Sequence, residues 1–71
     1  MLILSQDNRA IYDTEKSVSI TVKGNIVYLL NVSGELAYPL GEYQNEERAK
    51  EVVEQIFMYE GCQDKFEMPV V

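Results

Sequence analysis

The chain has 71 residues, a formal net charge of −6 and an apolar fraction of 46%. This length predicts one domain, residues 1 to 71, and the apolar fraction excludes a disordered chain even at this charge. The acidity is local, since residues 42 to 71 carry eight Asp or Glu against three Lys or Arg. Without a basic patch, the composition argues against binding to nucleic acid or to an anionic membrane.

The N-terminal apolar run ends at Ser5, which is too short for a signal-peptide core, and no run approaches the length of a membrane span. Cys62 is the single cysteine and histidine is absent, so neither an internal disulfide nor a Cys/His metal site is expected. We therefore expect a cytoplasmic protein without a metal, a cofactor or a small-molecule ligand.

The first half of the chain predicts strands and tight turns. Residues 1 to 5 and 9 to 13 are predicted as short strands, separated by a turn at residues 6 to 8. Residues 17 to 23 alternate between apolar and polar, which places Val18, Ile20 and Val22 on one face of a strand. Gly24 and Asn25 then supply a two-residue hairpin turn, and the return strand covers residues 26 to 32.

The hairpin turns also predict the register. A loop at Gly24-Asn25 sets Val22 opposite Val27 and Ile20 opposite Leu29. A second two-residue loop at positions 33 and 34 brings in a third strand. It sets Leu29 opposite Tyr38 and Val27 opposite Leu40, and adds Leu36 to the same face. Because Pro39 has no amide donor, the third strand is expected at an edge of the sheet or with a bulge.

A helix is predicted from residue 46 to residue 60. Asn45 is a favourable N-cap, Glu46 and Lys50 form an i, i+4 pair, and Gly61 suits the C-terminal end. The apolar stripe predicted to face the core consists of Ala49, Val52, Val53, Ile56 and Phe57. After the helix, residues 65 to 69 alternate again and predict a last short strand. The fold class is therefore α+β, an antiparallel meander of four or five strands with one C-terminal helix on one face.

Four stretches together suggest relatives: residues 1 to 7, residues 40 to 43, the helix start at 46 to 49 and the segment at 66 to 69. They resemble short uncharacterised proteins of Gram-positive bacteria and their phages. The resemblance implies a bacterial or phage cytoplasm and nothing about chemistry.

The return strand is apolar on both of its faces. Val27 and Leu29 are assigned to the helix side, so the opposite side holds a candidate interaction set consisting of Ile26, Tyr28, Leu30 and Val32. These side chains need cover, which the terminal segments, a second copy or a different partner could provide.

No catalytic set can be assembled from the sequence. Cys62 follows a helix C-terminus, where the dipole disfavours a thiolate, and no histidine is present to act as a base. Glu47, Glu51 and Glu54 are expected to form a solvated helix face.

We therefore expect a non-catalytic protein, not an enzyme, that acts by self-association or by protein-protein interaction. The alternative is a phage-type inhibitor or DNA mimic, whose acidic helix surface blocks a basic site on a host protein.

Overall fold

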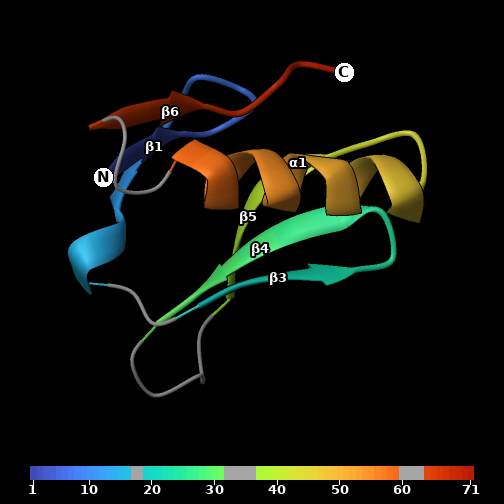
Figure 1. Ribbon diagram of the computed structural model, residues 1–71, viewed down its shortest axis with the longest axis horizontal. Helices are drawn as coiled ribbons and strands as arrows, with labels where there is room; N and C mark the ends of the chain where they lie inside the picture. The colour runs from blue at the N-terminus through green and yellow to red at the C-terminus, as the bar shows by residue number, and fades with distance from the viewer. Residues whose placement is uncertain (17–18, 32–36, 60–63) are drawn as a thin grey trace.

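The computed structural model describes residues 1–16, 19–31, 37–59 and 64–71. In chain order the elements are β1 (Leu2–Leu4), β2 (Ile11–Asp13), a short 3-10 helix (Thr14–Lys16), β3 (Ser19–Lys23), β4 (Ile26–Leu30), β5 (Ala37–Glu42), α1 (Glu46–Tyr59) and β6 (Lys65–Glu67). The α+β class with one C-terminal helix is confirmed (Figure 1). Outside the described residues lie the predictions for Val18, Val32, the turn at 33 and 34, Leu36, Gly61 and Cys62.

The strands are divided between two sheets. The chain ends form the sheet β2-β1-β6, in which β1 is antiparallel to β2 and parallel to β6. The middle of the chain forms the antiparallel sheet β3-β4-β5, so the predicted meander describes this second sheet alone. The division arises because β6 follows the helix and returns beside β1, pairing Phe66 with Ile3.

The hairpin of β3 and β4 has the predicted register. Val22 pairs with Val27 and Ile20 pairs with Leu29. At the turn Gly24 has φ = +61°, a value that glycine adopts without steric cost.

The pairing of β4 with β5 follows the prediction at Leu29 and Tyr38 but not at Val27, which lies opposite Gly41 instead of Leu40. A β-bulge between Val27 and Tyr28 causes this shift, because β5 carries one extra residue there. β5 is also an edge strand, so both expectations drawn from Pro39 are met.

Helix α1 begins at the predicted cap. The Asn45 Oδ1 atom accepts a hydrogen bond from the Arg48 amide at 2.8 Å, and Lys50 forms an ion pair with Glu46 at 3.1 Å. Ala49, Val52 and Ile56 are buried. The prediction for Phe57 was wrong, because its side chain is 75% exposed. The helix packs against β3 and β4 through a narrow stripe of side chains, and Phe57 lies outside that stripe.

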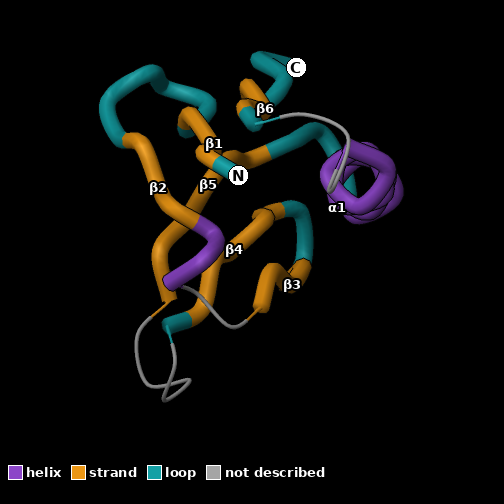
Figure 2. The backbone as a smooth tube through the Cα atoms, turned by 60° about the vertical axis from the view of Figure 1, so that its left-hand side comes forward, coloured by secondary structure: helices purple, strands orange, loops and turns teal. Residues whose placement is uncertain are grey.

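The two sheets and the helix enclose one core. Figure 2 shows the helix closing the side on which the two sheets diverge. The largest fully buried side chains come from four different elements: Ile3 from β1, Val27 from β4, Leu40 from β5 and Val52 from α1. Each element therefore contributes to the same apolar layer.

Gln6 and Tyr43 join the two sheets to the C-terminal segment. The Gln6 side chain accepts a hydrogen bond from the Glu42 amide and donates to the carbonyls of Glu42 and Val70, while its backbone amide donates to Leu40. The Tyr43 hydroxyl donates to the Pro69 carbonyl at 2.9 Å. Tyr43 is 4% exposed, and burial raises the pKa of its phenol above the ordinary 10.0.

The burial pattern of the helix gives a direct test of the core face. We expect Ile56→Ala to lower the free energy of unfolding by about 2 to 5 kcal/mol, as truncation of a buried aliphatic side chain does. Phe57→Ala should change it by less than about 0.5 kcal/mol, because a surface side chain contributes little. Urea denaturation of both variants measures the difference. Similar losses in the two would show that Phe57 also faces the core.

The Tyr43 ring passes close to Gly41 in β5. A methyl group at position 41 would be 2.8 Å from the Tyr43 hydroxyl oxygen and 3.1 Å from Gln6 Cβ. Gly41→Ala should therefore destabilise the protein by about 1 to 3 kcal/mol through overpacking. The cost should fall in a Tyr43→Phe background, where the closest contact is absent. Thermal or urea melts of the four proteins test this, and additive losses would contradict it.

Candidate interaction surface

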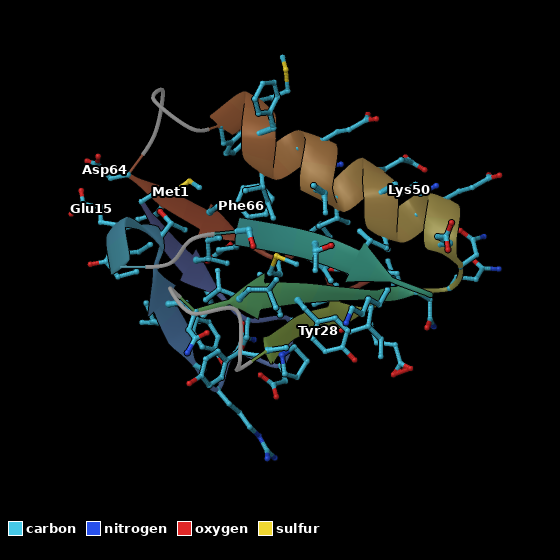
Figure 3. All side chains as sticks on the ribbon, turned by 90° about the horizontal axis from the view of Figure 1, so that it is seen from below. Met1, Glu15, Tyr28, Lys50, Asp64 and Phe66 are labelled. Atoms are coloured by element: carbon cyan, nitrogen blue, oxygen red, sulfur yellow. The ribbon has the colours of Figure 1, made fainter. Side chains whose placement is uncertain are left out.

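The predicted interaction residues lie on the face of β3-β4-β5 that is turned away from the helix. Val27 and Leu29 are buried on the helix side, at 0% and 3% exposure. The residues that alternate with them along β4, namely Ile26, Tyr28 and Leu30, are only partly buried. In Figure 3 Tyr28 lies on the opposite side of the sheet from α1. Val32, the fourth predicted member, is outside the described residues.

The register defines the neighbours of these three side chains. Residues paired directly across strands share a face, so the outer face consists of three rows. The rows run across β3, β4 and β5 in the order Lys23, Ile26, Glu42; Thr21, Tyr28, Pro39; and Ser19, Leu30, Ala37. We call this set of nine residues the outer face. Its centre is apolar along β4, and its charged side chains are at the two ends of one row.

The turn between β1 and β2 borders the outer face on the β5 side. A hollow of about 370 Å³ there is lined by residues of both regions, including Asp7, Ile26, Tyr28 and Glu42. The Asp7 carboxylate accepts hydrogen bonds from the Ser5 hydroxyl at 2.6 Å and from the Arg9 amide at 3.0 Å. These bonds, chiefly the one from Ser5, hold the pKa of Asp7 below its ordinary 3.8.

A second apolar surface, which the sequence analysis did not identify, lies on the outer side of β2-β1-β6. Leu2 is 41% exposed and Ile11 is 67% exposed. A groove of about 630 Å³ connects them to Tyr59 at the end of the helix, whose ring meets Phe66 edge to face at 5.1 Å. The alternation of side-chain directions along residues 2 to 4 indicates which of them share a face of the strand. Three residues are too few to show which of the two faces is covered.

The acidic helix face is exposed as predicted. Glu47, Glu51 and Glu54 are all in the exposed class, and Arg48 contacts Glu51 at 3.7 Å while also donating to the Val71 carbonyl. Within the described ranges no three His, Cys, Asp or Glu side chains are grouped so that they could hold a metal ion. Among the described residues, no helix has the length and the apolar character that a membrane span requires.

No family model matches the chain, and neither the curated proteins nor the solved structures include one similar to it. The geometry therefore defines the class: a small α+β domain whose larger sheet has one face in the core and one partly exposed apolar face.

The hydrogen bonds to Asp7 give a pH prediction. Because the pKa of Asp7 is lowered on folding, its stabilising contribution is present above pH 3.8 and is lost as the pH falls through the folded-state pKa. An NMR titration of the Asp7 carboxyl should have its midpoint below 3.8, and Ser5→Ala should move the midpoint upward. An unchanged midpoint in Ser5→Ala would show that the hydroxyl does not stabilise the carboxylate.

Proposed function

We propose that this protein is non-catalytic and acts by protein-protein association through the outer face of β3-β4-β5. The observation that carries the proposal is the unequal burial of the two sides of β4, where Val27 and Leu29 are buried and Ile26, Tyr28 and Leu30 are not. Apolar side chains gathered on one partly exposed face favour association, because their further burial releases ordered water.

The composition of the outer face is typical of an interface. A tyrosine lies at its centre between two aliphatic side chains, and the charged side chains are at its margin. Interfaces are enriched in tyrosine and depleted of charge at their centre, with a polar rim. The geometry thus supports docking of a surface of matching apolar character.

A second candidate function uses the acidic helix surface to block a basic site on a host protein. The exposed carboxylates of Glu47 and Glu54 favour it, since neither has an ion pair among the described residues. Removal of charge from the helix distinguishes the two functions. A complex held by the helix carboxylates weakens when Glu47 and Glu54 are both replaced by Gln, whereas docking through the outer face does not depend on them.

Leu30 and Leu29 provide a matched pair of variants for the main proposal. Leu30→Glu should give a folded protein that no longer associates, because a carboxylate there must be desolvated in the complex. Leu29→Glu should fail to fold, because its side chain is in the core. Circular dichroism and sedimentation measure the two properties. A Leu30→Glu protein that unfolds as completely as Leu29→Glu would contradict the proposal.

A further inference from the structure

We infer that the surface which docks on the outer face is the outer face of a second copy, packed about a two-fold axis parallel to β4. This inference rests on the proposed function and names its partner. It follows from the arrangement of charge on β3 and β5.

The row nearest the β3-β4 turn has opposite charges at its two ends. Lys23 on β3 and Glu42 on β5 flank Ile26 on β4, so their backbones are two strand spacings apart, roughly 10 Å. Both side chains are exposed, and neither forms an ion pair with any other described residue. Asp7 adds a further carboxylate beside Glu42. One edge of the outer face is therefore basic and the other is acidic.

A two-fold rotation about an axis along β4 exchanges these edges. In such a face-to-face pair β4 lies over β4 of the second copy, and β3 lies over β5 of the second copy. Lys23 then faces Glu42 of the second copy, and the symmetry repeats this contact at the other edge. Ile26, Tyr28 and Leu30 face their own equivalents. Aligned sheets pack about 10 Å apart, a gap that the long Lys and Glu side chains can bridge.

The row that carries the charges is held in place by hydrogen bonds. The Asn25 side chain donates to the Tyr43 carbonyl at 2.7 Å, and the Tyr43 amide donates to the Asn25 carbonyl at 2.9 Å. Gln6 binds both backbone groups of Glu42. Little backbone freedom remains to be lost when the two copies meet, which favours binding.

The contact area is small, so the dimer should be weak. Three strands of five residues cover about 250 Å² in projection, at about 4.8 Å between strands and about 3.4 Å per residue. Interfaces of standard size bury about 800 Å² on each partner. Dimerisation should therefore be measured at low salt over a protein range of about 10 µM to about 1 mM.

Charge exchange between the two edges tests the arrangement. Sedimentation equilibrium is measured for the wild-type protein, Lys23→Glu, Glu42→Lys, the double variant and an equimolar mixture of the two single variants. Each single variant should have a dimer dissociation constant about tenfold higher, because two like-charge contacts replace two ion pairs. The double variant should recover wild-type affinity. The mixture should form heterodimers, since each protomer then meets its complement in the other.

Two controls accompany these variants. Lys65→Glu and Glu54→Lys make the same changes in net charge at exposed positions outside the outer face, and they should leave the dissociation constant within about twofold. Circular dichroism confirms that all variants fold.

The outcomes separate this inference from the proposed function. A monomer throughout the concentration range overturns the second copy as partner and leaves a different protein as the occupant of the outer face. A dimer that Leu30→Glu dissociates, but that the charge exchanges alter no more than the controls do, overturns the two-fold arrangement alone. A dimer that Leu30→Glu leaves intact overturns both the inference and the proposed function.

Discussion

The structure depends on one apolar layer that no element can form alone. Its largest fully buried members, Ile3, Val27, Leu40 and Val52, come from three strands and the helix. Sheets of three short strands and an isolated helix of 14 residues are each marginal in water, so none of these parts is expected to persist without the others. Packing of the two sheets and the helix around this one layer is therefore what makes the fold cooperative.

The β-bulge in β5 connects this core to the surface. Strict alternation from Tyr38 would place Leu40 in the core and Glu42 on the same side. The extra residue instead lets Leu40 remain buried while Glu42 pairs with Ile26 and shares its outward direction. The bulge thus keeps Leu40 in the core and also places Glu42 in the charged row of the outer face.

The small number of elements explains why each sheet has an outer side with accessible apolar side chains. α1 closes the core on one side, where it packs against β3 and β4, and the described residues include no second α-helix that covers the outer side of either sheet (Figure 2). The outer face of β3-β4-β5 differs from the groove around Leu2 and Ile11 because its apolar side chains follow one central strand, with opposite charges on the two neighbouring strands. These properties make it the stronger basis for a proposed association surface.

The candidate site was predictable in its centre and at one edge but not at the other. The two-residue period identified Ile26, Tyr28 and Leu30 as a set that shares one side of a strand, and the structure places them together. Lys23 follows from the predicted hairpin register, which sets it opposite Ile26, although it was not assigned to that set. Glu42 does not, because an unbroken register would turn it to the side of Leu40, and only the bulge in β5 pairs it with Ile26. An extra residue in one strand leaves no periodic signal.

The sequence by itself determined the local elements: the hairpin at Gly24, the cap at Asn45 and the helix stripe through Val52 and Ile56. These follow from backbone preferences and from side-chain periods that act within a few residues. Only the tertiary structure decided that β6 pairs in parallel with β1, that the strands divide into two sheets and that Phe57 is exposed. A period shows which residues share a face, whereas the cover of that face depends on elements distant in the chain.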